Sequence, residues 1–186
     1  MVRATGVLRR EHQSIREALN FAEGVSVKME GGEQSPPEVL AKVMDFFRLY
    51  VDRCHHGKEE EVLFPLLEKK GMSTSSGPLG VMLMEHDQAR ALIQEMSEAA
   101  EAYKADGESA GARWARAAWD YSGLMQEHFG KEEDLLFRMA DNVLGPEDEE
   151  AIAAGFKQVE KEKIGPEKHE ELEATMRDLI ARNGGR

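Results

Sequence analysis

The chain has 186 residues, which is long enough to bury a hydrophobic core without disulfides and which favours a single domain. Hydrophobic residues make up 41% and charged residues 32%, a balance typical of globular rather than disordered proteins. The formal net charge of −12 argues against nucleic acid and against anionic membrane surfaces as partners, because both carry negative charge.

Cysteine usage and hydropathy bear on where the protein resides. Cys54 is the only cysteine, so no intrachain disulfide can form, which fits a reducing compartment. The N-terminal sequence MVRATGVLRREHQ becomes polar too early for a signal peptide. No apolar run approaches the roughly 18 residues that a membrane span needs. These features predict a cytoplasmic protein.

Apolar residues recur at spacings of three and four through most of the chain, which predicts helices. The breakers GGEQSPP and GMSTSSGP, and the Asp-Gly at 106–107, separate four long segments. The predicted helices cover residues 5–29, 37–69, 78–105 and 109–144. Short connections make consecutive helices antiparallel neighbours, so residues 1–144 are predicted to form an all-α, up-down-up-down four-helix bundle.

Residues 145–186 are predicted to form a C-terminal helical extension of one or two helices, divided at Gly165-Pro166. The stretches AIAAGFKQV and LEATMRDLI each carry an apolar face. We therefore expect the extension to pack on the bundle, with a loosely attached helical tail as the alternative.

An internal repeat suggests where the chemistry lies. HHGKEEEVLF at 55–64 and HFGKEEDLLF at 128–137 are identical at seven of ten positions, and REHQSIREAL at 10–19 resembles MEHDQARALI at 84–93. The chain therefore reads as two helical hairpins. Each hairpin has a lone Glu-His on its first helix and a His-x-x-x-Glu on its second.

Distances along the helices place these motifs together. Four histidines lie at matching distances from their hairpin turns, about 32 Å at about 1.5 Å per residue. Each lies on an otherwise apolar helical stripe and is therefore expected to face the core. A glutamate four residues after a histidine lies one turn further along the same face. The candidate set is His12, His55, Glu59, His86, His128 and Glu132.

These six residues are of the types that bind metal ions in proteins. A lone helical histidine is most often a satisfied core or surface residue, but four at mirrored positions in two repeats favour ligation. Unpaired imidazoles and carboxylates are costly in an apolar interior. The mixture suits two metal ions bridged by the carboxylates and favours iron, with manganese or zinc as alternatives.

With these motifs, residues 5–144 resemble the hemerythrin-like family, also called the HHE cation-binding domain. The resemblance rests on the Glu-His at 11–12, on CHHGKEEEVLFP, on MLMEHDQAR and on HFGKEEDLLF. It implies two iron ions, Fe²⁺ or Fe³⁺ with an oxo or hydroxo bridge, inside the bundle. It also implies a small diatomic ligand or peroxide as partner and a role in oxidative or nitrosative stress. It leaves any protein partner open.

Two positions depart from oxygen-carrying members of that family. Those members have a further histidine where this chain has Arg90, and an aspartate where it has Glu133. We take Glu132 as the ligand. One iron then lacks a protein ligand, and water or another side chain takes that place.

An open coordination position favours reaction with O₂, peroxide or nitric oxide, including weak peroxidase-like or catalase-like activity. An iron-sensing module that acts through a protein partner is one alternative. Reversible O₂ binding is another.

The remaining polar residues near the motifs are given supporting roles. His56 aligns with Phe129 of the second copy, so we expect it to flank or support the ligands, with direct ligation as the less favoured alternative. Tyr50, Tyr121 and Arg90 are further candidates for such support. Glu60, Glu61, Glu133 and Asp134 are expected on solvated faces or in ion pairs between helices. Glu11 and Glu85 are expected to be exposed, with a hydrogen bond from a ligand histidine as the alternative.

Overall fold

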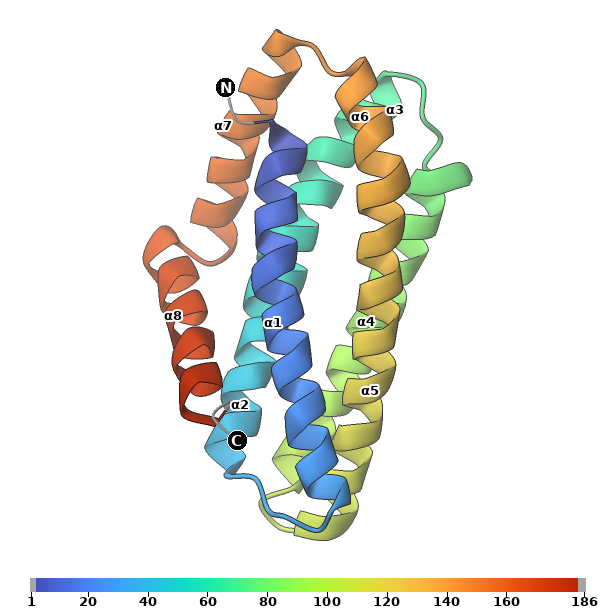
Figure 1. The fold of residues 1–186 in the computed structure, drawn as a ribbon. Coiled ribbons are helices and arrows are strands. Elements are labelled where there is room, and N and C mark those ends of the chain that lie inside the picture. The colour runs from blue at the N-terminus through green and yellow to red at the C-terminus, as the bar shows by residue number, and fades with distance from the viewer. Residues whose placement is uncertain (1–2, 184–186) are drawn as a thin grey trace.

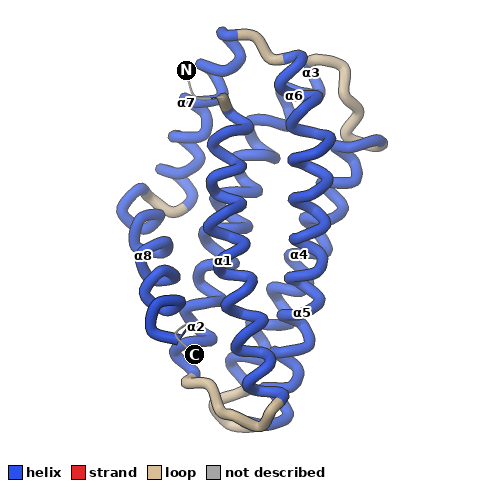
Figure 2. Tube along the Cα trace, viewed as in Figure 1, coloured by secondary structure: helices blue, strands red, loops and turns tan. Residues whose placement is uncertain are grey.

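The computed structural model describes residues 3–183, and all regular secondary structure within them is helical, as predicted (Figures 1 and 2). The α-helices and the π-helical stretches, which are labelled η, are α1 (Ala4–Glu30), α2 (Pro37–Asp45), η1 (Phe46–His56), η2 (Glu59–Leu63), α3 (Phe64–Lys69), α4 (Gly77–Ala102), α5 (Gly107–Lys131), η3 (Glu132–Leu136), α6 (Phe137–Val143), α7 (Pro146–Lys163) and α8 (Pro166–Asn183).

Four long helical segments lie side by side and form what we call the four-segment core (Figure 1). They are α1, the continuous run from α2 to α3, α4, and the continuous run from α5 to α6. The connections after α1 and after α4 lie at the same end of the molecule (Figure 1). The observed ends of these segments fall within three residues of the predicted ends.

Glycine and proline explain the first connection. Gly32 has a φ of +82°, a left-handed conformation that side chains disfavour, and it follows the last turn of α1. The amide of Glu33 donates to the carbonyl of Lys28, which closes that last turn. Pro37 then opens α2, where the missing N–H costs nothing because a first-turn amide has no helical partner.

Spacing did not predict the π-helical stretches, and they change which side chains face inward. η1 ends at His56, while η2 and η3 begin at the ligand candidates Glu59 and Glu132. A π-turn holds more residues than an α-turn, so consecutive side chains diverge less around the axis. His55 and His56 are accordingly both fully buried.

The apolar core consists of two clusters with a polar layer between them. One cluster includes Ile15 and Val51 and extends toward the hairpin turns. The other includes Leu8 and Leu63 and extends toward the opposite end. His12 lies between Leu8 and Ile15 in sequence, and the other candidate ligands lie at the same level. The candidate site is therefore enclosed above and below by apolar side chains.

Helices α7 and α8 cover one side of the four-segment core, along α1 and the run from α2 to α3 (Figure 1). Ile152 and Phe156 of α7 join one apolar cluster, and Leu172 and Met176 of α8 join the other. A Cβ on Gly155 would lie 2.7 Å from a methyl of Val62, so glycine permits this close approach.

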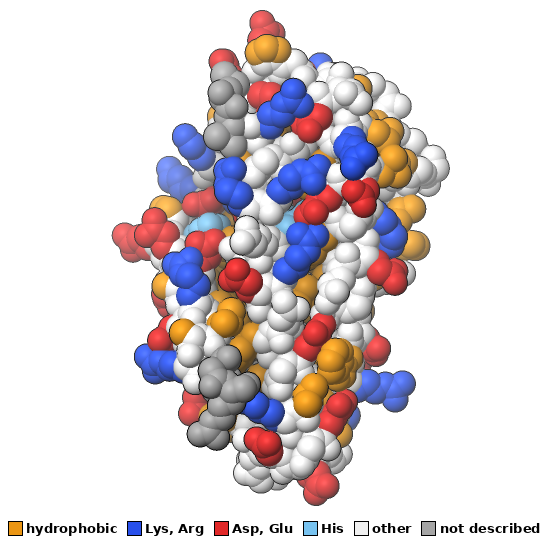
Figure 3. Space-filling model, viewed as in Figure 1, with side chains coloured by type: hydrophobic (Ala, Val, Ile, Leu, Met, Phe, Trp, Pro, Cys, Tyr) orange, Lys and Arg blue, Asp and Glu red, His pale blue; other side chains and the backbone are white. Residues whose placement is uncertain are grey.

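The distribution of charge on the surface and the hydrophobicity of the helices are relevant to possible binding partners. Acidic and basic side chains are interspersed over the face seen in Figure 3, with apolar atoms scattered among them. Within residues 3–183, none of the helices combines the length and the apolar character needed to cross a bilayer.

Candidate metal centre

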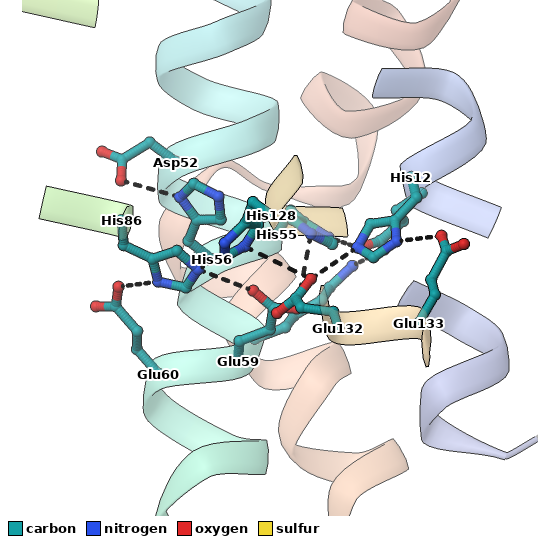
Figure 4. Close-up of polar contacts among 12 residues, drawn as sticks. His12, Asp52, His55, His56, Glu59, Glu60, His86, His128, Glu132 and Glu133 are labelled. Carbon is teal, nitrogen blue, oxygen red and sulfur yellow. Dashed lines mark hydrogen bonds and ion pairs between the residues drawn. The ribbon is translucent and has the colours of Figure 1, made fainter. Parts of the chain in front are cut away.

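The structure brings all six predicted ligands together in the middle of the four-segment core, and all six are buried (Figure 4). His12 comes from α1, His86 from α4 and His128 from α5. His55 and Glu59 come from η1 and η2, and Glu132 comes from η3. Each hairpin therefore contributes one side chain from its first helix and two from its second to the same layer, as the mirrored spacing predicts.

The donor atoms form two groups, and in each group they lie within 4.8 Å of one another. The first group, called the three-histidine group below, consists of His56, Glu59, His86 and His128. The second, called the two-histidine group, consists of His12, His55, Glu59 and Glu132.

Two carboxylates connect the groups. Glu59 belongs to both: one of its oxygens lies 3.7 Å from His55 Nε2, and the other lies 3.4 Å from His86 Nε2. Glu132 Oε2 lies 3.2 Å from His12 Nε2 and 3.5 Å from His128 Nε2. Both carboxylates thus lie between the imidazoles of the two groups.

Each of the four histidines predicted as ligands has a carboxylate at its outer nitrogen. His12 Nδ1 lies 2.7 Å from Glu133, and His86 Nδ1 lies 2.6 Å from Glu60. The other two contacts are His55 Nδ1 to Glu11 at 2.9 Å and His128 Nδ1 to Glu85 at 3.0 Å. A carboxylate only accepts hydrogen bonds, so each Nδ1 carries a proton that it donates outward.

The inner nitrogens are then lone-pair acceptors directed at one another and at carboxylate oxygens. His86 Nε2 and His128 Nε2 lie 3.2 Å apart, which is unfavourable for two lone pairs without a shared cation. Buried atoms with no hydrogen-bond partner include His12 Nε2, His55 Nε2, both ring nitrogens of His56, and all four oxygens of Glu59 and Glu132. A buried layer of acceptor atoms without hydrogen-bond partners is the arrangement expected of a site that binds metal cations.

Electrostatics supports this reading. Burial, and then the charge of Glu132, raises the pKa of Glu59 well above its usual range. Burial opposes the charged form of Glu132 too, but His128 and His12 outweigh it and lower its pKa. Burial, and then the neighbouring His56, lowers the pKa of His86 to about 3, which keeps this imidazole in the neutral form that metals bind.

His56 lies inside the three-histidine group, whereas its alignment with Phe129 favours a place beside the ligands. Its ring stacks on that of His86 with the centroids 3.9 Å apart, and it is fully buried. Burial, and then His55 and His128, lowers its pKa well below the usual value. The π-helical turn of η1 is what directs His55 and His56 toward the same layer. His56 thus brings a fifth imidazole into this layer, from η1.

The repeated acids and lysines turn out to support the ligands. Glu11 and Glu85 were expected to be exposed, but they are 7% and 6% exposed and hold His55 and His128. Lys58 donates to Glu11 at 2.5 Å, and Lys131 makes the equivalent contact with Glu85. The sequence signal was the repeat itself, because every member of these pairs recurs 73 or 74 residues later.

The hydroxyl groups of Tyr50 and Tyr121 lie in two different environments. The Tyr50 hydroxyl donates to Glu173 of α8 at 2.8 Å, so it points toward the C-terminal helices. The Tyr121 hydroxyl is buried with no hydrogen-bond partner, and its ring packs 4.8 Å from that of Phe47. Burial raises the pKa of both phenols, which keeps them protonated.

Arg90 of α4 forms ion pairs with acidic side chains that lie outside the set of predicted ligands. Its guanidinium donates to Asp52 at 2.8 Å and to Glu60 at 2.6 Å. Glu60 accepts from His86, and Asp52 lies 3.7 Å from His56 Nδ1. Arg90 therefore holds Glu60, the hydrogen-bond partner of His86, and keeps Asp52 beside His56.

Replacing Arg90 with methionine is expected to weaken metal binding by about tenfold or more, the usual effect of losing an outer contact to a ligand. Glu60 would lose its hydrogen bond from Arg90 and would therefore hold His86 less firmly. Competition against a chelator measures the affinity. Arg113→Met on the exposed face of α5 serves as the control. Equal affinity in the two variants would show that Arg90 does not position the ligands.

The chain is similar to a known protein family and to several known proteins. The model of the hemerythrin HHE cation-binding domain family matches residues 3–140. The uncharacterized protein Rv1995 of Mycobacterium tuberculosis is 24% identical over 159 residues, which is 85% of this chain and 61% of that protein. The chain thus spans about three fifths of that relative. No solved structure matches.

Two relatives have a descriptive name. The iron-sulfur cluster repair protein YtfE of Edwardsiella ictaluri is 36% identical over 90 residues, which is 47% of this chain and 40% of that protein. The protein of the same name from Citrobacter koseri is 28% identical over 145 residues, covering 72% of this chain and 63% of that protein.

Proposed function

Because the chain belongs to the hemerythrin HHE cation-binding domain family, we propose that it is a non-haem di-iron protein that binds or reacts with O₂, peroxide or nitric oxide. The proposal includes an up-down-up-down bundle over residues 1–144 and a C-terminal extension over residues 145–186. The observation that carries it is the buried layer of inward-facing acceptor atoms without hydrogen-bond partners.

In this proposal His56, His86 and His128 hold one ion, and His12 and His55 hold the other. Glu59 and Glu132 lie between the two positions. When bound, iron supplies the redox chemistry and the affinity for small oxygen and nitrogen species. Manganese or zinc would fit the same donors, and the mixture of imidazole and carboxylate favours iron.

The protein's own contribution is to orient the imidazoles and exclude water. Carboxylates at the Nδ1 atoms of His12, His55, His86 and His128 fix the tautomers and raise the basicity of the inner nitrogens. The two-histidine group has one imidazole fewer, so we assign the open coordination position to that side. Phe129 stacks on His12 there with ring centroids 4.1 Å apart, and Phe137 lies at 5.5 Å. These apolar rings favour a small, weakly polar ligand over a bulky one.

The names of the YtfE relatives favour a second candidate, in which the protein donates iron for the repair of iron–sulfur clusters. Iron sensing through a protein partner, and reversible O₂ binding, remain further alternatives. Donation requires iron that leaves readily, whereas reaction with small molecules requires iron that stays bound.

We expect reconstituted protein to hold about two iron ions per chain and its optical spectrum to change with O₂, peroxide or nitric oxide. Metal analysis and absorption spectra before and after each addition measure this. Stable iron with no response to any of the three would contradict the reactivity. Rapid transfer of the iron to a chelator, again without a response, would favour donation.

A further inference from the structure

A second cluster of metal-binding side chains lies outside the central site, where the C-terminal helices meet the four-segment core. Cys54 of η1, Glu160 of α7 and His169 of α8 place one donor atom each within 4.8 Å of one another. Cys54 is 1% exposed, and Glu160 and His169 are partly buried. The three donors thus converge from three helices, and Cys54 is far from the other two in sequence.

One of these donors, His169, has a ring nitrogen that no hydrogen bond occupies. The Nε2 atom of His169 is buried without a hydrogen-bond partner, and it lies 4.0 Å from Glu160 Oε2. The ring of His169 is held by Tyr50, whose ring lies 4.7 Å away. Tyr50 in turn donates to Glu173, which lies one helical turn beyond His169. The imidazole is therefore positioned, with its free nitrogen directed at the other donors.

The cluster is also reachable. A cavity of about 600 Å³ is lined by Tyr50, Lys58, Glu160 and His169, together with side chains of α1 and α7. Helices α7 and α8 lie beside α1 in Figure 1, and all three contribute residues that line the cavity. A cation could enter through this cavity, and a fourth ligand such as water could occupy it. A site with three protein donors and one position facing a cavity is typical of zinc.

The positive charge of Lys58 lies near the proposed site and would repel a bound cation. Its ammonium lies 3.3 Å from Glu160 and 2.5 Å from Glu11. Glu11 lies closer, so the lysine keeps a carboxylate partner when Glu160 turns to a metal. The thiolate and carboxylate bring two negative charges to the cation, which offset the nearby lysine.

We propose that Cys54, Glu160 and His169 bind a third divalent cation, of the borderline softness of zinc, which joins the C-terminal helices to the core. The mixture of thiolate, imidazole and carboxylate is a zinc donor set and differs from the sulfur-free central site. This inference is independent of what the central ions do. Metal there would fix α7 and α8 against η1.

Cobalt(II) tests the proposal, because thiolate-bound cobalt has a near-ultraviolet charge-transfer absorption. Cys54 is the only cysteine, so this absorption reports this site alone even while cobalt also fills the central site. We expect metal-free protein to develop the band, to saturate it at one thiolate-bound cobalt per chain, and to lose it on addition of zinc. Cys54→Ser should abolish it.

The variants separate a built site from a reactive thiol. His169→Ala and Glu160→Ala should weaken cobalt binding at this site at least tenfold, while Glu162→Ala on the exposed face of α7 should not. His128→Ala, which alters only the central site, should retain the band. Circular dichroism checks that each variant folds. Absence of the band from wild-type protein, or an equal band in the His169 and Glu160 variants, would overturn the proposal.

Discussion

Replacement of Glu59 by alanine is expected to remove nearly all bound iron, whereas replacement of Glu61 two residues later leaves it in place. Glu59 is fully buried and belongs to both donor groups, so its loss deprives both ions of a ligand. Glu61 is exposed and pairs with Lys163 at the surface, where such pairs contribute little. The matched pair therefore separates ligation from a general effect of lost acidic charge.

The same substitution should abolish stabilisation by metal. In wild-type protein, two ions each present at about 100 times their Kd would add about 5 kcal/mol to the free energy of unfolding. For a chain of this size, that raises the Tm by about 10 °C or more. Thermal unfolding with and without iron, alongside metal analysis, measures both effects. A Glu59→Ala protein that retains two ions and the full shift would show that the carboxylate is not a ligand.

Replacement of His56 by phenylalanine is expected to lower the iron content from about two ions per chain to about one. Phenylalanine is the residue at the equivalent position 129 of the repeat, and it preserves an aromatic ring against His86. The three-histidine group would lose a donor, while the two-histidine group would keep all of its own. Metal analysis and chelator competition would resolve the loss of one ion.

Tyr121→Phe provides the control for a change in the same buried interior. It removes a hydroxyl that has no hydrogen-bond partner, so iron content and stability should be nearly unchanged. If His56→Phe also retained two ions at wild-type affinity, His56 would support its neighbours without binding metal. The ion beside His86 and His128 would then need another donor in place of His56.

The repeat was informative because it is written in local spacing. Residues four apart on a helix share a face, and equal distances from a turn place residues level across a hairpin. These two rules were sufficient to bring His12, His86 and the two His-x-x-x-Glu pairs into one layer. Family membership, expected from the same residues, is confirmed by the match over residues 3–140.

The supporting contacts could not be read in this way. For the four histidines predicted as ligands, the carboxylate that binds Nδ1 comes from a different helix, and Glu60 and Glu133 come from the other hairpin. Such pairings depend on how far neighbouring helices rotate about their axes. In a single sequence, the acids of GKEE are indistinguishable from a solvated face.

The sequence by itself determined the helical class, the limits of the long helices and the six side chains that meet at the centre. The tertiary structure alone decided that His56 joins them, because π-helical turns alter the angle between successive side chains without changing the residue pattern. It also decided that Cys54, Glu160 and His169 converge, because the docking of α7 and α8 depends on contacts between distant apolar faces. Helical periodicity states which face is apolar, and only packing states what that face meets.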